Sequence, residues 1–73
     1  MKNYPRPGEK WNHYKGGEYE IITLAVHTET QETMVVYKSL LFGTIYCRPF
    51  SIWYDVVTWE NRRVTRFTIS ENQ

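Results

Sequence analysis

The stretch EYEIITLAV at residues 18–26 decides the fold that we expect for this chain. Its Tyr, Ile, Thr, Leu and Val residues favour β-strands. Successive side chains of a strand point to opposite faces. Apolar residues fall on both faces here: Tyr19, Ile21 and Ala25 on one, and Ile22, Leu24 and Val26 on the other. A strand that is apolar on both faces lies in the centre of a sheet or curls through a closed barrel.

A second strand is predicted for residues 33–42, TMVVYKSLLF, after the polar segment HTETQE. If residues 28–31 form the loop, the two strands make a β-hairpin whose apolar residues face each other. The pairs expected on this basis are Leu24 with Val35 and Ile22 with Tyr37.

Shorter elements follow the hairpin. Gly43 predicts a turn before a third strand, TIYC, at residues 44–47. Pro49 suits the first position of a helical turn. Apolar residues then recur at helical spacing: Phe50, Trp53, Tyr54 and Val57. We therefore expect one or two helical turns, of α- or 3₁₀-type, near residues 49–54.

The last part of the chain has the pattern of a hairpin. Residues 56–59 (VVTW) and 63–70 (RVTRFTIS) flank a turn in which Asn61 tolerates the left-handed backbone conformation. Together, these elements predict a mainly β fold of about five short antiparallel strands with one helical turn. Bending into a small closed or nearly closed barrel would hide the edges of such a sheet.

A chain of 73 residues has room for one small domain. We expect this single barrel domain to span residues 11–69. Residues 1–10 hold Pro5, Pro7 and Gly8 among charged residues, which favours a flexible, extended N-terminal arm. Residues 70–73, SENQ, are expected to form a frayed C-terminal tail.

The composition argues against several classes of protein. A net charge of +1 is no signature of nucleic-acid binding. Cys47 is the only cysteine, which excludes an internal disulfide, and secreted domains of this size usually depend on disulfides. The N-terminal residues do not resemble a signal peptide, and the longest uncharged stretch, residues 39–47, is far shorter than the ~20 residues of a membrane helix. We therefore expect a soluble cytoplasmic protein without a membrane partner.

The segment HYKGGEYEIITLAVHTETQETMVVY at residues 13–37 resembles the motif of a bacterial family catalogued as domain of unknown function 1653. The matching blocks are His13–Gly16, Tyr19–Ile21, Ala25, His27–Thr30, Glu32, Val35, Tyr37, Arg48–Pro49 and Arg66–Phe67. The chain departs from the family pattern at Val26, Ser51 and Thr65, where a basic residue, an acidic residue and a proline are usual. The resemblance implies a small SH3-like β-barrel and no established activity.

The two histidines, His13 and His27, do not predict a metal site. Most of the chain between them is expected to be extended, and a rise of about 3.3 Å per residue would place them tens of ångströms apart. A metal site also needs three or four ligands, and the His and Cys residues show no ligand spacing. We expect no metal and no cofactor. Cys47 is expected to be a packed strand residue rather than an activated thiol.

His27 ends a predicted strand, and Glu29 follows two positions later. Glu29 could therefore hold the imidazole in a functional orientation. The alternative, which we favour, is that these side chains satisfy backbone polar groups of the loop.

Arg48 is the polar residue that we single out, because it lies at a strand end among aromatic residues. Its guanidinium could stack on a ring as part of the structure, or bind a carboxylate or phosphate, and both interpretations stay open. We prefer a non-catalytic binding module that recognises a peptide or an anionic group through an aromatic and basic groove, by analogy with SH3-like barrels. The candidate ligand-binding residues are Tyr14, Lys15, His27, Glu29, Tyr37, Arg48 and Trp53.

Two alternative functions remain. Arg62, Arg63 and Arg66 could bind a single-stranded nucleic acid with a steep salt dependence, although the near-neutral net charge makes this less favoured. A small enzyme or an accessory subunit could use His27 as a general base oriented by Glu29. No further catalytic pattern supports that idea, so we expect no catalytic residues.

Overall fold

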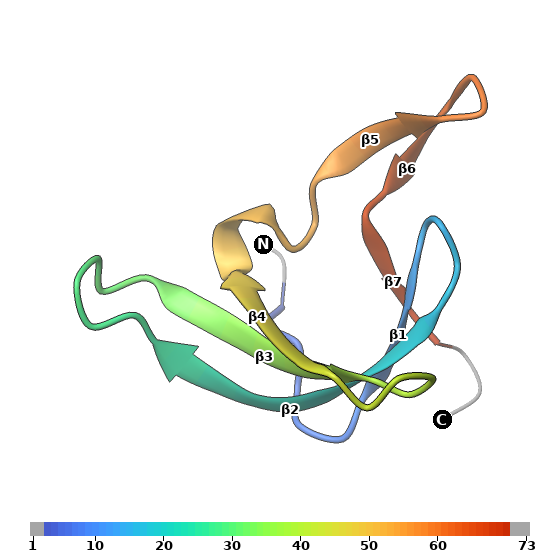
Figure 1. The fold of residues 1–73 in the computed structure, drawn as a ribbon. Helices are drawn as coiled ribbons and strands as arrows, with labels where there is room; N and C mark the ends of the chain where they lie inside the picture. The colour runs from blue at the N-terminus through green and yellow to red at the C-terminus, as the bar shows by residue number, and fades with distance from the viewer. Residues whose placement is uncertain (1–2, 71–73) are drawn as a thin grey trace.

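The computed structural model describes residues 3–70, which form seven β-strands and one 3₁₀ turn (Figure 1). The strands are β1 (Lys10–His13), β2 (Glu18–Val26), β3 (Thr33–Ser39), β4 (Ile45–Pro49), β5 (Val56–Trp59), β6 (Arg62–Thr65) and β7 (Phe67–Ile69), and the 3₁₀ turn is η1 (Phe50–Ile52). The predicted mainly β fold is confirmed, with seven strands in place of about five. Of the predicted C-terminal tail, residues 71–73 lie outside the described residues, as do residues 1–2 of the predicted arm.

Five strands form one antiparallel sheet in the order β4-β3-β2-β1-β7, and β5 pairs with β6 in a separate two-stranded ribbon. The prediction of a closed or nearly closed barrel is therefore wrong, because the sheet is open and has β4 and β7 as its edges. After Pro49 the chain turns away through η1, and the next hairpin folds on itself instead of pairing with β4. Figure 1 shows this ribbon standing apart from the bent five-stranded sheet.

The strand predicted for residues 63–70 is interrupted at Arg66, which separates β6 from β7. The backbone N–H of Arg66 donates to the Asp55 carbonyl at 2.7 Å, and its carbonyl accepts the Tyr14 N–H at 3.0 Å. β6 therefore pairs with β5, whereas β7 leaves the ribbon and pairs with β1. β7 lies within the strand predicted for residues 63–70, whereas β1 was not predicted, and their pairing joins segments that are far apart in the sequence.

The predicted hairpin of β2 and β3 forms with one shift of register. Leu24 faces Val35 as predicted, but Tyr37 faces Ile21 rather than Ile22. The pairing shifts between Ile21 and Thr23, where a β-bulge adds one residue to β2. The bulge turns the side chain of Ile21 into the core, at 1% exposure, and leaves Ile22 at 39%.

The second strand of this hairpin is shorter than predicted. β3 ends at Ser39, and residues 40–42 belong to the turn, because the Gly43 N–H donates to the Ser39 carbonyl at 2.8 Å. Gly43 has a φ of 75°, a conformation that glycine adopts without strain.

The helical turn predicted near residues 49–54 is confirmed. η1 is closed by the Trp53 N–H, which donates to the Phe50 carbonyl at 2.9 Å. The predicted helical stripe stops before Val57, which belongs to β5. The turn places the indole of Trp53 in the core, where it is fully buried.

The core lies between the five-stranded sheet and η1. Its buried residues are Trp11, Ile21, Val35, Tyr37, Trp53 and Phe67. The rings of Trp53 and Phe67 stack with centroids 4.0 Å apart and planes 3° apart. Stacked aromatic pairs contribute about 0.5–1.5 kcal/mol beyond their buried area. Because four of these residues are aromatic, a chain this short still buries a substantial apolar surface.

The proline-rich segment before β1 lies against the rest of the domain. Pro5 is buried, and the ring of Tyr4 lies 4.2 Å from that of Phe50. The N–H of Gly8 donates to the Ile21 carbonyl at 2.8 Å. The backbone turns at residues 7–8, where the Glu9 N–H donates to the Arg6 carbonyl at 3.1 Å, so the segment is not extended throughout, and its flexibility stays a prediction.

Candidate functional site

Arg48 lies on the core-facing side of the edge strand β4. It is directly opposite Val35, which is fully buried, so both side chains lie on the same face of the sheet. The Nε–H of Arg48 donates to the hydroxyl of Tyr37 at 3.0 Å. The guanidinium carbon lies 5.2 Å from the ring centroid of Phe67 and 6.0 Å from that of Tyr37. Within residues 3–70, Arg48 takes part in no ion pair.

The guanidinium borders a shallow groove of about 230 Å³. Residues of five strands line this groove, which we name the Arg48 groove: His13, Tyr19, Tyr37, Tyr46, Arg48 and Phe67. The rings of Tyr37 and Tyr46 lie 5.7 Å apart on its β3–β4 side. The groove therefore combines aromatic walls with one fixed cationic fork.

His13 lies on the opposite side of the groove, at the end of β1. It pairs with Phe67 of β7, and the two rings make an edge contact at 5.1 Å. The backbone N–H of Lys15 donates to Nδ1 of His13 at 3.1 Å. Nδ1 is thus an acceptor, and Nε2 carries the proton of the neutral ring.

The electrostatic surroundings of His13 are cationic. Partial burial lowers the pKa of His13 below its ordinary value, and the positive charges of Arg48, Arg66 and Lys15 lower it further. An anion bound in the groove would reverse this effect, because it would favour the protonated ring.

Only some of the predicted binding residues meet at this groove. Arg48 and Tyr37 are in direct contact. Tyr14 and Lys15 lie beside it, since the Tyr14 ring is 4.6 Å from that of His13 and the Lys15 Nζ is 5.8 Å from the Tyr14 ring centroid. Trp53 is fully buried, so its indole belongs to the core.

His27 and Glu29 lie at a different place, in the loop between β2 and β3. Nδ1 of His27 accepts the backbone N–H groups of Glu29, at 3.2 Å, and of Thr30, at 3.3 Å. The Glu29 carboxylate is 3.7 Å from the same nitrogen, a contact that would be an ion pair only with a protonated Nδ1. We give weight to the two backbone bonds, which need an unprotonated Nδ1. This geometry matches the loop-capping interpretation of the sequence.

The sequence did not single out His13 as a neighbour of Arg48. Their proximity depends on the pairing of β1 with β7, which sets His13 opposite Phe67, on whose ring Arg48 rests. The one available signal was the position of His13 next to Tyr14 and Lys15, which were already candidates.

The three arginines of the nucleic-acid hypothesis lie in β6 and directly after it. Arg62 and Arg63 are consecutive residues of β6, so their side chains point to opposite faces of the ribbon. The Nη2 of Arg66 lies 3.7 Å from the Asp55 carboxylate.

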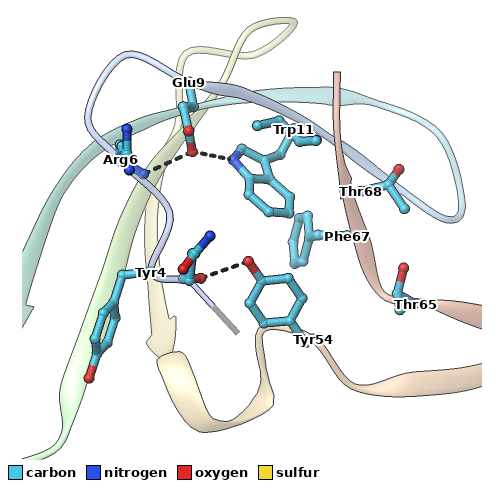
Figure 2. Close-up of a pocket in the computed structure, with 10 residues that line it drawn as sticks. Tyr4, Arg6, Glu9, Trp11, Tyr54, Thr65, Phe67 and Thr68 are labelled. Carbon is cyan, nitrogen blue, oxygen red and sulfur yellow. Dashed lines mark hydrogen bonds between the residues drawn. The ribbon is translucent and has the colours of Figure 1, made fainter. Parts of the chain in front are cut away.

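A larger cavity of about 540 Å³ lies between the N-terminal segment and β7. Figure 2 shows that the Glu9 carboxylate faces the indole of Trp11 and the backbone of Arg6. Glu9 Oε1 accepts the Trp11 Nε1–H at 3.1 Å and the Arg6 N–H at 2.9 Å, and the Tyr54 hydroxyl donates to the Asn3 carbonyl at 2.7 Å. These bonds attach the N-terminal segment to the core. We therefore interpret this cavity as the space beneath the attached N-terminal segment. We place the candidate site at Arg48, which makes no ion pair within the described residues.

Two further results concern other kinds of site. No cluster of His, Cys, Asp and Glu residues within the described part of the chain could hold a metal ion. Among residues 3–70, no helix is long and apolar enough to cross a membrane.

The comparisons with known proteins agree with one another. The family model described as "Protein of unknown function (DUF1653)" matches residues 9–69. The chain is similar to the crystal structure of a DUF1653 protein from Bordetella bronchiseptica, with 35% sequence identity and a TM-score of 0.74 over 86% of this chain and 83% of that chain. No curated protein matches the chain. The resemblance read from the sequence motif is confirmed, and the chain belongs to the DUF1653 family.

Proposed function

We propose that this protein is a non-catalytic binding module whose Arg48 groove receives an anionic group, a carboxylate or a phosphate. The observation that carries this proposal is the state of Arg48. Its guanidinium is held by Tyr37 and rests on Phe67, yet it makes no ion pair with the described residues. A fixed guanidinium fork forms strong, charge-assisted hydrogen bonds with such anions.

The surrounding charges support an anionic ligand. Arg66 and Lys15 act on His13 together with Arg48, and the charged groups that shift the His13 pKa are all cations. The aromatic rings beside the guanidinium lower the local dielectric constant, which strengthens its interaction with a bound anion.

The assignment to the SH3-like class is part of the same proposal. A small, bent antiparallel sheet with a 3₁₀ turn before its last strands supports it. Domains of that class often bind ligands in grooves lined by aromatic residues, which is an argument by analogy of fold.

The direct test is a two-dimensional NMR titration of the ¹⁵N-labelled protein with sodium acetate and, separately, with inorganic phosphate at constant ionic strength. We expect saturable shifts at Arg48 Nε–H, at the His13 ring and at the neighbouring amides. Arg48→Ala should abolish these shifts, while Arg63→Ala, which removes an exposed arginine of β6, should leave them unchanged.

Either of two results would overturn the proposal. The first is the absence of saturable shifts with both anions, and the second is unchanged shifts in Arg48→Ala. If Arg48→Ala unfolds, Arg48→Gln takes its place, because glutamine keeps most of the length of the side chain without the charge. Saturable shifts that persist in a folded Arg48→Gln variant would equally contradict the proposal.

A further inference from the structure

Strand β4 is an open edge of the sheet. In the described chain it pairs with β3 alone, and it carries exposed apolar side chains, with Ile45 at 60% and Tyr46 at 42% exposure. Cys47, expected from the sequence to be packed, is also exposed. Exposed edges of this kind accept an additional strand readily.

The backbone of β4 offers hydrogen-bonding groups toward the open side. The Ser39 N–H donates to the Thr44 carbonyl at 2.9 Å, and in an antiparallel pair every second residue bonds its neighbour strand. Continuing this alternation along the register, Tyr46 and Arg48 direct their backbone groups toward β3. Ile45 and Cys47 therefore direct their N–H and C=O groups away from the sheet.

The side chains of β4 alternate between the two faces of the sheet. Tyr46 and Arg48 both line the Arg48 groove, whereas Cys47 between them lies on the opposite face. A strand added beside β4 would thus place two of its side chains, two residues apart, next to the groove. One would lie beside Arg48 and the other beside Tyr46.

We propose that an extended peptide adds to β4 as an antiparallel strand, with an Asp or Glu side chain beside Arg48 and an apolar side chain beside Tyr46. In the antiparallel direction the order is acidic residue, any residue, apolar residue. This inference rests on the proposed function, since the acidic side chain is the anion of the Arg48 groove. The ligand is a peptide, because the regular row of outward backbone donors and acceptors along β4 matches the main chain of another strand.

Charge argues against a second copy of β4 as the added strand. In a two-fold arrangement centred on Cys47, Arg48 would face Tyr46 of the other copy. That arrangement would bring two Arg48 residues onto one face with no carboxylate from either β4 strand. An acidic peptide instead supplies the charge that the groove lacks.

The test uses three blocked heptapeptides and the full-length protein. The first is Gly-Ser-Glu-Thr-Val-Ser-Gly, acetylated and amidated; the second replaces its Glu with Gln; the third carries an N-methyl group on its Thr. The N-methyl group removes the N–H that would bond the Cys47 carbonyl. Affinities are measured by NMR titration, and amide hydrogen exchange of Ile45 and Cys47 is followed in the free and bound protein.

We expect the Glu peptide to bind at least about tenfold more tightly than either modified peptide, a difference of about 1.4 kcal/mol. Its binding should slow the exchange of the Ile45 and Cys47 amides. Cys47→Pro removes an outward N–H without removing a bond to β3, so it should fold and lose the same affinity. Sodium acetate should still bind this variant.

The outcomes separate this inference from the proposed function. If acetate binds at Arg48 but the N-methylated peptide binds as tightly as the Glu peptide, strand addition is wrong and the anion site stands. If acetate, inorganic phosphate and all three peptides fail to bind, both proposals fail. Concentration-dependent dimerisation with slowed Cys47 exchange in the absence of peptide would assign the edge to a second copy and overturn the inference.

Discussion

The side chain of Arg48 on the edge strand β4 is anchored to Tyr37 on β3 by a hydrogen bond of 3.0 Å from Nε–H to the phenolic oxygen. Tyr37 is only 4% exposed, so the acceptor lies at the boundary of the core. The bond fixes a charged side chain against aromatic rings and leaves the outer part of the fork toward the groove.

The first prediction concerns this bond. Tyr37→Phe keeps the buried ring and removes the acceptor, so we expect the free energy of unfolding to fall by about 0.5–1.5 kcal/mol. Acetate binding at Arg48 should weaken as well, because the guanidinium loses its anchor. Urea denaturation and NMR titration measure the two effects.

Tyr46→Phe is the matched control. Tyr46 lies directly opposite Tyr37, and its hydroxyl makes no hydrogen bond to residues 3–70. We expect its stability to change by no more than about 0.5 kcal/mol. Equal losses in the two variants would show that the Arg48–Tyr37 bond contributes nothing specific.

The second prediction is a pH dependence that originates at His13. Its pKa is lowered in the folded protein by burial and by Arg48, Arg66 and Lys15. The unfolded chain therefore binds more protons as the pH falls through about 6.5, and stability falls with it; above that pH this loss is absent. Urea denaturation at several pH values between about 7 and 5.5 should show this decline.

His13→Asn provides the comparison. Its Oδ1 can still accept the Lys15 N–H, but the side chain does not titrate. We expect a flatter stability profile over the same pH range than in the wild-type protein. Profiles of equal slope would mean that His13 is not the group responsible.

The third prediction concerns the phenol of Tyr54. Burial raises the pKa of Tyr54 above its ordinary value of 10.0, and the charge of Glu9 raises it further. The unfolded chain loses this proton first, so the corresponding stability is present below about pH 10 and is lost as the pH rises above it. Glu9→Gln keeps an acceptor for Trp11 and removes the charge.

We expect Glu9→Gln to lower the Tyr54 pKa part of the way toward its ordinary value. The measurement is an alkaline titration followed by NMR of ¹³Cζ-labelled tyrosine, with Tyr54→Phe to assign the signal. An unchanged Tyr54 pKa in Glu9→Gln would contradict an influence of the Glu9 charge.

The fourth prediction concerns the turn between β5 and β6. Glu60 and Asn61 have φ angles of 52° and 64°, the left-handed conformations of a type I′ turn. Asparagine tolerates this conformation better than glutamate. Glu60→Asn should therefore raise the free energy of unfolding by a few tenths to about 1 kcal/mol.

Glu60→Gln is the control for this change, because it removes the charge without the conformational advantage. We expect its urea midpoint to match that of the wild-type protein. A gain of the same size in Glu60→Gln would assign the effect to charge rather than to the turn.

Local patterns predicted the parts of the fold that depend on neighbouring residues. The β2–β3 hairpin, the turn at Gly43, the 3₁₀ turn and the left-handed Asn61 all follow from short-range spacing and turn preferences. Arg48 and Tyr37 were both named from the sequence as candidate ligand-binding residues, and the pairing of β3 with β4 places them in contact; their role in binding stays a prediction.

Tertiary structure decided the rest. The β-bulge after Ile21 places Ile21 opposite Tyr37, whereas simple alternation had predicted Ile22 at that position. The pairing of β1 with β7 places His13 beside Phe67, whose ring contacts Arg48. The open edge at β4 likewise arises because the β5–β6 hairpin pairs with itself after the turn at η1. Residue spacing along the chain records contacts within a hairpin, whereas contacts between distant strands depend on how whole elements pack. The sequence therefore determined the local hairpins and turns and the presence of Arg48 at the end of β4, and the packing of distant strands decided which side chains surround its guanidinium.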